Sequence, residues 1–294
     1  MPELPEVEIV RRGLEPVLTG TTITSLDLRR PDLRFPFPDN FASRLNGQRV
    51  VAVNRRAKYL LIALDNGETL IIHLGMTGRL SVAPADRPQA PITFGDYVYG
   101  SSADAKHDHV VMTLAGGTTI TYNDPRRFGF MLLAHNAGLD HHPLLANIGP
   151  EPLGNSFDAH YLAAKAKDKR TGLKAFLLDQ RIVAGLGNIY VSEALHAAGL
   201  SPKRRAGTLA GARKQALKRS EDLATAVRTV LSRAIAAGGS TLKDYRQTDG
   251  SSGGFQNEFA VYGRDGEPCC RCAGTILRLV QAQRATFYCP DCQN

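Results

Sequence analysis

Hydrophobic positions follow two different patterns along the chain. Between residues 21 and 133 they fall in short β-branched runs such as "TTITSLDL", "YLLIAL" and "HVVMTLAGGTTITYN", which are separated by Gly, Pro and polar residues. Runs of this length predict the strands of an antiparallel β-sandwich or barrel. Residues 84–106 are rich in Pro and Gly, and we expect a long loop there.

The second pattern is helical and extends from residue 158 to about residue 237. Within it, "LLDQRIVAGLGNIYVSEALHAAGLSP" predicts a helix, a glycine turn and a second helix. The buried face of that second helix is expected to carry Val191, Leu195 and Ala198. Gly199 is suited to end the helix, because glycine readily adopts the left-handed conformation found just beyond helix ends.

The first residues, "MPELPEVEIV", predict a short helix over residues 1–14. Pro5 suits a first helical turn, and acidic side chains suit the positive end of a helix. Gly13 is expected to weaken the helix near its end. Pro2 and Glu3 lie ahead of the first turn that Pro5 begins, and they have no evident structural task in the helix.

Charge changes this picture by indicating a partner. The net charge is +8 at pH 7, and residues 201–220 contain seven Lys or Arg and no acid. This balance favours a polyanion, with nucleic acid ahead of an anionic membrane surface. No apolar run is long enough to span a bilayer, and the acidic beginning differs from a signal peptide. We therefore expect a cytoplasmic protein with reduced thiols.

The cysteines supply the most specific spacing signal. The pattern C-x2-C-x16-C-x2-C is typical of a tetrahedral Zn²⁺ site, and its four ligands would be Cys269, Cys272, Cys289 and Cys292. The intervening "TILRLVQAQRATFYC" predicts a β-hairpin, so the unit is a zinc finger with one structural Zn²⁺. Cys270 lies between ligands and is expected to take no part.

A glycine turn provides a second nucleic-acid signal. The stretch "AGLGN" leads into a helix N-terminus, where free backbone N–H groups suit a phosphate, and Asn188 can add a side-chain contact. A simple turn between helices remains the alternative. The turn, the basic runs and the finger together favour nucleic acid.

These features, read in order along the chain, resemble bacterial formamidopyrimidine-DNA glycosylase. The motifs that carry the resemblance include "PELPEVE", "RRAKYLL", "IIHLGMTG", "KHDHV", "DPRRFG", "GLGNIYVSEAL", "GGSTLKD", "VYGRDGEPC" and "QRATFYCPDC". The resemblance covers essentially the whole chain. It implies an α+β multidomain fold with an N-terminal antiparallel β-sandwich, a helix-two-turn-helix domain and a C-terminal β-hairpin zinc finger.

The resemblance also implies where the domains lie and what they do. It places a catalytic β-sandwich domain at residues 2–135, a linker at 136–157, a helix-two-turn-helix domain with a lesion-capping loop at 158–257, and the zinc finger at 258–294. The implied activity is base-excision repair by a monomer that acts on double-stranded DNA in the nucleoid. It removes oxidised purines (8-oxoguanine and formamidopyrimidines) and cleaves the resulting abasic site by β,δ-elimination.

By the same resemblance, the N-terminal motif carries the chemistry. Pro2 is the nucleophile once Met1 has been removed, and its nitrogen forms a Schiff base with the sugar. Glu3 is the general acid that protonates the sugar ring oxygen. Glu6, one helical turn further on, supports the same proton network.

Further positions match residues that act on the DNA backbone and on the base stack. Lys58 matches the residue assigned to β-elimination. Arg284 matches the residue assigned to δ-elimination, but we weight it toward phosphate binding because a guanidinium does not readily release its proton. The expected DNA contacts are His107, Arg126, Lys169 (where the basic run permits a shift of one residue) and Asn188. The expected intercalating residues are Met76, Arg126 and Phe128.

Two alternatives remain at this point. An endonuclease VIII-like glycosylase for oxidised pyrimidines would share the N-terminal motif and the finger, whereas "ELPEV" and the three intercalating residues favour the purine enzyme. A non-catalytic zinc DNA-binding module is the other alternative. Pro2, Glu3 and Lys58 together argue against it, because a scaffold has no need of this trio.

Overall fold

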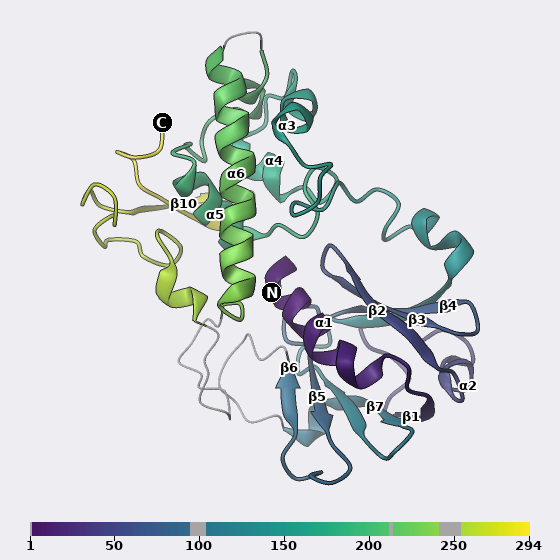
Figure 1. The fold of residues 1–294 in the computed structure, drawn as a ribbon. Coiled ribbons are helices and arrows are strands. Elements are labelled where there is room, and N and C mark those ends of the chain that lie inside the picture. Colours follow the sequence, from purple (N-terminus) through teal and green to yellow (C-terminus); the bar gives the residue numbers. More distant parts are fainter. Residues whose placement is uncertain (1, 95–103, 212–213, 241–253) are drawn as a thin grey trace. The chain divides into compact units, whose positions relative to one another are not determined.

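The computed structural model describes residues 2–94, 104–211, 214–240 and 254–294. The chain divides into two compact units (Figure 1). The first unit comprises residues 1–146 and 238–254, and the second unit comprises residues 147–237 and 255–294. The finer division into four segments stays a prediction.

Helix α1 is longer than the sequence predicts. It covers Leu4–Leu18 instead of ending near Gly13. The helix continues because Leu14 and Leu18 are fully buried in the core of the first unit. Gly13 lets the ring of Phe94 pack against the helix, since a Cβ there would lie 2.3 Å from a ring carbon of Phe94. Tertiary contact therefore outweighs the low helix propensity of this glycine.

Two antiparallel sheets form the first unit, as the sequence predicts. One sheet has the strand order β2-β3-β4-β9, made of Val50–Arg56, Tyr59–Leu64, Glu68–His73 and Phe130–His135. The other has the order β1-β7-β8-β5-β6, made of Ile23–Leu28, Asp108–Leu114, Thr119–Asn123, Arg79–Ala83 and Ile92–Phe94. A single hydrophobic core draws residues from both sheets and from α1, which confirms the β-sandwich.

The loop predicted over residues 84–106 is wrong in part. Ile92–Phe94 forms the edge strand β6, which pairs antiparallel with β5, and Phe94 packs against the core. Backbone pairing and this aromatic contact organise a segment whose composition indicates a loop. Residues 95–103 lie outside the described residues. The remaining short helices of the first unit are α2 (Phe41–Leu45), η1 (Ala105–His107) and η2 (Asn136–His141).

The second unit contains the predicted helices. They are α3 (Ala159–Ala166), α4 (Leu173–Leu178), α5 (Asn188–Ala197) and α6 (Lys214–Ala236), with the short helices η3 (Ala206–Leu209) and η4 (Phe255–Glu258). Val191 and Leu195 are buried on α5 as expected. Ala198 is only half-buried and is the C-cap of α5, so its assignment to the buried stripe is wrong. Gly199 has a φ of +67° and ends the helix as predicted.

The last part of the second unit is the predicted hairpin. Strands β10 (Leu277–Gln281) and β11 (Arg284–Tyr288) pair antiparallel around a two-residue turn. A small separate core that includes Ile276 and Phe287 lies beneath it. No helix in the described part of the chain is long and apolar enough to cross a bilayer.

Candidate active site and zinc centre

The chain enters α1 through two buried residues, Pro2 and Glu3. Glu3 is 3% exposed and is the N-cap of the helix. Its carboxylate accepts from the backbone N–H of Glu6, and its own N–H donates to Glu6 Oε2 at 2.8 Å. This reciprocal capping box fixes the backbone at the start of the helix. The predicted nucleophile and general acid are therefore held next to each other in one geometry.

Glu6 also connects the N-terminus with a distant part of the first unit. Its Oε1 accepts from both the backbone N–H and the hydroxyl of Ser240, each at 3.0 Å. Glu6 and Ser240 are both buried. Glu6 therefore links the start of α1 to Ser240, and its part in a proton network stays a prediction. Most of the polar segment that the sequence assigns to lesion capping, residues 241–253, lies outside the described residues.

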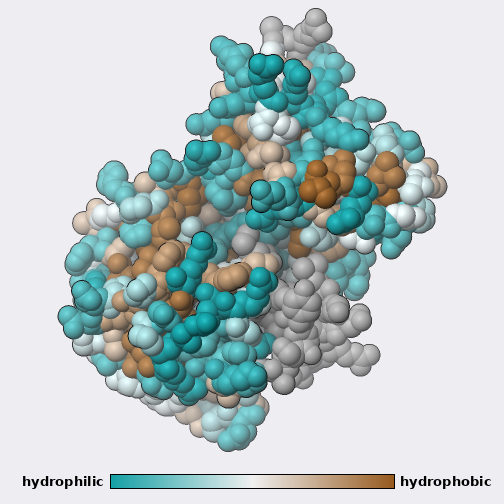
Figure 2. Space-filling view, turned by 180° about the vertical axis from the view of Figure 1, so that it is seen from behind, coloured by the Kyte–Doolittle hydropathy of each residue, from teal (hydrophilic) through white to brown (hydrophobic). Residues whose placement is uncertain are grey.

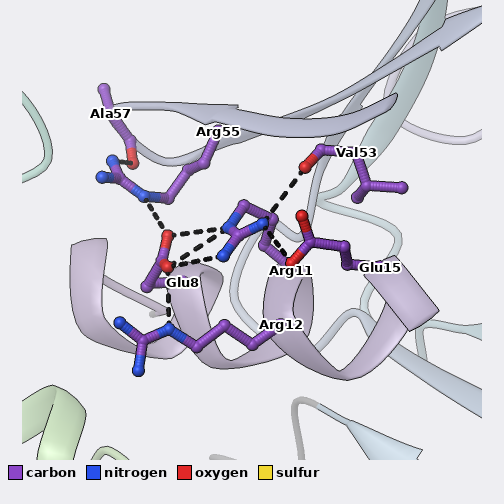
Figure 3. A network of polar contacts seen from close by, with 7 residues as sticks. All are labelled: Glu8, Arg11, Arg12, Glu15, Val53, Arg55 and Ala57. Atoms are coloured by element: carbon purple, nitrogen blue, oxygen red, sulfur yellow. Dashed lines mark hydrogen bonds and ion pairs between the residues drawn. The ribbon is translucent and has the colours of Figure 1, made fainter. Parts of the chain in front are cut away.

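A network around Glu8 fastens α1 to the sheet (Figure 3). Arg11, Arg12 and Arg55 donate to the Glu8 carboxylate, and Arg11 also reaches the carbonyl of Val53 on β2. Burial alone would raise the pKa of Glu8, but the hydrogen bonds from the three arginines hold it below its ordinary value. The carboxylate is therefore ionised at neutral pH and ties helix and strand together.

Lys58 is positioned by the same network. It follows Ala57 in the turn between β2 and β3, where Ala57 has a φ of +51°. Arg55 donates to the carbonyl of Ala57 at 2.9 Å, so Glu8, Arg55 and this turn form one connected unit (Figure 3). Lys58 itself is buried. The sequence does not predict the part played by Glu8, because the bond to Arg55 joins residues that are 47 positions apart.

The three predicted intercalating residues line one groove of the first unit. This groove has a volume of about 580 Å³ and is lined by Leu33, Arg34, His73, Gly75, Met76, Arg126, Arg127 and Phe128. The Arg126 guanidinium lies 4.6 Å from the centre of the Phe128 ring, a cation–π contact. Phe128 is 43% exposed, unlike the aromatic residues of the core. The face drawn in Figure 2 is largely hydrophilic, with hydrophobic residues exposed in separate patches.

Asp124 holds the two loops that form the groove. It is fully buried, and its carboxylate accepts from the Gly129 N–H at 2.9 Å, from the Tyr122 hydroxyl at 3.2 Å and from the Thr77 hydroxyl. The Thr77 oxygen in turn accepts from the Arg126 N–H at 3.2 Å. The residue after Met76 is thus joined to the loop of Arg126 and Phe128.

Two further contacts complete this arrangement. Gly75 has a φ of +63°, and a Cβ there would lie 2.4 Å from the backbone of Phe128 and Gly129, so only glycine permits the approach. The backbone of the predicted DNA contact His107 also lies next to that of Asp124. Its carbonyl accepts from the Asp124 N–H at 3.1 Å.

Replacing Asp124 by Asn is expected to loosen the groove. The NH₂ group of Asn would face N–H and hydroxyl groups that now donate to the Asp124 carboxylate. The buried hydrogen bonds lost in this way should lower the free energy of unfolding by about 1–3 kcal/mol. Denaturant unfolding should show this loss, whereas Asp86→Asn, at an exposed carboxylate, should stay within about 0.5 kcal/mol of the unaltered protein. Equal stability of the two variants would contradict this role for Asp124.

His73 lines the groove although the sequence does not single it out. Burial, together with the positive charges of Lys58 and Arg34, lowers its pKa to about 4. The Gly75 N–H donates to its Nδ1 at 3.0 Å, and its ring stacks on Phe130. The ring is therefore neutral at physiological pH, with its proton on Nε2. In the sequence, the feature that could have indicated His73 is its position at the end of a strand, three residues before Met76.

In the second unit, Asn188 and the residue after Arg284 are in contact. Asn188 begins α5, and its Nδ2 donates to the Ala285 carbonyl at 3.1 Å. Its Oδ1 is buried and has no hydrogen-bond partner among the described residues. Arg284 is exposed beside the hairpin turn. Lys169 is exposed after α3, and its carbonyl accepts from Gly207 N–H.

Two buried charges that the sequence does not single out support this part of the second unit. Lys174 Nζ donates to the Ala285 carbonyl at 2.8 Å and to the Thr286 hydroxyl at 2.6 Å. Glu193 on α5 accepts from three successive backbone N–H groups, those of residues 260–262. Both side chains act on partners far away in the sequence, which a local pattern does not indicate.

The four predicted zinc ligands meet at one point. Their sulfur atoms all lie within 4.8 Å of one another. Cys269 and Cys292 have sulfurs 3.8 Å apart, and those of Cys272 and Cys289 are 3.5 Å apart. A tetrahedron with Zn–S bonds of about 2.3 Å requires a separation of about 3.8 Å. The residues present therefore fit one Zn²⁺.

Family models match three parts of the chain. They are the formamidopyrimidine-DNA glycosylase N-terminal domain over residues 1–131, the H2TH domain of the same proteins over 148–246, and the zinc finger found in FPG and IleRS over 266–294. A formamidopyrimidine-DNA glycosylase of Azorhizobium caulinodans is 59% identical over the full length of both chains. The chain belongs to the formamidopyrimidine-DNA glycosylase family.

Solved structures of formamidopyrimidine-DNA glycosylases have the same fold. The MutM (Fpg) protein of Thermus thermophilus is 39% identical, with a TM-score of 0.80 over 99% of this chain and 98% of that one. A Lactococcus lactis Fpg variant in complex with Fapy-dG-containing DNA is 34% identical, with a TM-score of 0.84 over both full chains. The family, the fold and the single structural zinc predicted from the sequence are thus confirmed.

Proposed function

We propose that this protein repairs DNA by excising oxidised purines, such as 8-oxoguanine and formamidopyrimidines, and then cleaving the strand at the abasic site. The observation that carries the proposal is the buried Pro2–Glu3 pair at the start of α1, in a chain of the formamidopyrimidine-DNA glycosylase family. The Lactococcus lactis relative bound to Fapy-dG-containing DNA supports this substrate class.

A damaged base must leave the duplex before an enzyme can act on it. The space that it leaves must be filled, and the groove residues have suitable chemistry. Met76 and Phe128 provide apolar wedges, and Arg126 provides hydrogen-bond donors for the unpaired opposite base. The contact of Arg126 with Phe128 and the bonds of Asp124 hold these groups in place before DNA binds.

Pro2 supplies the nucleophile after Met1 is removed. An unperturbed α-amino group has a pKa of about 8, so a useful fraction is neutral at physiological pH. The amine attacks the sugar C1′, the bond from C1′ to the base breaks, and the sugar ring opens to leave an iminium cation. This cation acidifies the neighbouring C2′–H. Loss of that proton expels the 3′ phosphate, and a second elimination expels the 5′ phosphate.

Glu3 donates the proton that the sugar ring oxygen takes up as the ring opens. Lys58 assists the first elimination. The neutral Nε2–H of His73 and the cations of Lys58 and Arg34 provide donors for backbone phosphate in this unit. In the second unit, Asn188, Lys169 and Arg284 bind phosphate, with Arg284 held at the tip of the zinc hairpin.

The zinc supplies structure and no chemical step. The hairpin has a small core, so the metal stabilises its fold and thereby the position of Arg284. We further propose that the protein acts as a monomer in the cytoplasm, associated with the nucleoid through DNA. The division at residues 135, 157 and 257 into catalytic domain, linker, helix-two-turn-helix domain and finger belongs to the same proposal.

A panel of duplexes tests this function. Four duplexes are compared: one with 8-oxoguanine opposite cytosine, one with a formamidopyrimidine, one with an oxidised pyrimidine and one without damage. Base release and strand cleavage are measured separately for each. We expect both products with the purine lesions and none from undamaged DNA. A clear preference for the pyrimidine would favour the endonuclease VIII-like alternative. Tight binding of every duplex without base release would favour a non-catalytic module.

Glu3→Gln is expected to slow base release by about 10²- to 10⁴-fold, since the amide retains the shape of the capping residue but cannot act as a proton donor of the required strength. Single-turnover excision of 8-oxoguanine measures the effect. Glu15→Gln, at an exposed carboxylate on the same helix, is the matched control and should leave the rate unchanged. A rate for Glu3→Gln equal to that of the control would exclude Glu3 as the acid.

A further inference from the structure

Helix α5 ends against the zinc centre through a histidine. His196 lies in the last turn of α5 and is 2% exposed. Its Nε2 is 3.4 Å from the Sγ of Cys269, which is itself buried. Buried polar groups in proteins are nearly always hydrogen-bonded. We therefore ask which hydrogen bond the buried imidazole of His196 makes with this metal-ligating sulfur.

The four cysteines leave no coordination position for this histidine. Their sulfurs all lie within 4.8 Å of one another, with two pairs at 3.8 and 3.5 Å, so together they supply the four ligands of a tetrahedral site. A zinc-bound thiolate carries negative charge and accepts hydrogen bonds, whereas the Nε2 of a neutral imidazole can donate one. The contact between His196 and Cys269 is therefore an N–H···S hydrogen bond from outside the ligand set.

A second side chain joins the same two elements in the opposite direction. Arg271, between the first two ligands, donates through Nη1 to the His196 carbonyl at 2.8 Å. Its backbone N–H donates to Cys269 Sγ at 3.4 Å. The His196 carbonyl also accepts from the Gly199 N–H at 3.0 Å, and the C-terminal end of a helix favours a cation. The C-terminal end of α5 and the turn from Cys269 to Cys272 are thus joined by two contacts, one from the His196 ring and one to the His196 carbonyl.

We propose that His196 is a positioning residue of the zinc centre, whose Nε2–H···Sγ bond to Cys269 stabilises the bound metal and fixes the finger on the end of α5. The other end of α5 carries Asn188, whose Nδ2 donates to the Ala285 carbonyl in β11, next to Arg284. One helix therefore orients the finger at both of its ends. The proposal concerns metal binding and stands independently of the DNA lesion recognised.

Metal affinity of the full-length protein tests the proposal without DNA. His196→Phe removes the donor and keeps an aromatic ring, and we expect the Zn²⁺ affinity to fall about 10- to 100-fold in competition with a chromophoric chelator. His196→Gln places an amide N–H near the position of Nε2 and should recover most of that loss. His160→Phe, at an exposed histidine of α3, should bind Zn²⁺ as the unaltered protein does.

The Co²⁺-substituted proteins give a spectroscopic readout. Without the N–H···S bond, the thiolate-to-cobalt charge-transfer band of His196→Phe should move to lower energy, while the visible bands keep the pattern of four sulfur ligands. A three-sulfur, one-nitrogen pattern in the unaltered protein would overturn the proposal, because His196 would then be a ligand. Equal losses of affinity in His196→Phe and His196→Gln would also overturn it, since packing alone would explain them.

The unaltered protein provides a test that survives if a variant does not fold. In the zinc-loaded protein labelled with ¹⁵N-histidine, the His196 ring should carry its proton on Nε2, and that proton should exchange slowly with water. A ring protonated only on Nδ1 would contradict the proposal.

Discussion

Pro2→Gly is expected to lower the rate of 8-oxoguanine release by about 10³-fold, because the proposed nucleophile is changed. Glycine retains an N-terminal amine but loses the secondary amine, which passes directly to an iminium cation. It also loses the pyrrolidine ring, which fixes the direction of the amine lone pair relative to the backbone. Single-turnover excision on duplex DNA, with removal of Met1 verified by mass, measures the change.

Pro5→Ala is the matched control for this substitution. Pro5 lies in the first turn of the same helix and is also buried, but its nitrogen is part of a peptide bond. The control should excise the base at close to the unaltered rate. If both variants lost activity equally, the cause would be damage to the start of α1, and Pro2 would not be the nucleophile.

The second large effect is expected at the zinc site. Cys289→Ser removes a fully buried ligand, and the finger should lose its metal and its fold, because the free energy of binding zinc is largely the free energy of folding in such units. Arg284 and the strand that Asn188 and Lys174 hold then lose their positions. DNA affinity should fall at least about 10-fold for each charge-assisted hydrogen bond to phosphate that the variant can no longer make.

The first unit should be affected little by the same substitution, since its core contains no residue of the finger. Its unfolding, followed separately from DNA binding, should therefore remain close to that of the unaltered protein. Cys270→Ser, at the exposed cysteine beside the ligands, is the control and should bind both zinc and DNA normally. Unchanged DNA binding after verified loss of metal from Cys289→Ser would contradict a DNA-contacting finger.

The features that the sequence predicts best are local. The zinc ligands lie in two C-x2-C turns joined by a short hairpin, so their spacing alone indicates the tetrahedron. The strands follow from alternating runs, and the turn before α5 follows from its glycines. Each of these depends on residues that are near one another in the sequence, which a pattern along the chain records directly.

Features that depend on distant contacts are not visible in this way. From the sequence alone, Glu8 looks like an acidic residue on the surface of a helix. The structure shows that Arg55, on strand β2, donates to it. In the sequence, Asp124 is only one residue of the "DPRRFG" motif. Its buried hydrogen bonds with Thr77 and Tyr122 are visible only in the structure. Gly13 indicates a helix end, but the ring of Phe94 packs against it and the helix continues. In each case the role is decided by a contact that the local pattern does not record.

The most direct measurement concerns the atom that Pro2 is proposed to use. The protein with Met1 removed is mixed with duplex containing 8-oxoguanine opposite cytosine and reduced with borohydride, and the trapped complex is digested and analysed by mass spectrometry. The DNA-derived sugar should be found on the nitrogen of Pro2, and the adduct should be absent from undamaged duplex. An adduct attached to Lys58 or another lysine, or no adduct while the base is still released, would contradict the proposed chemistry.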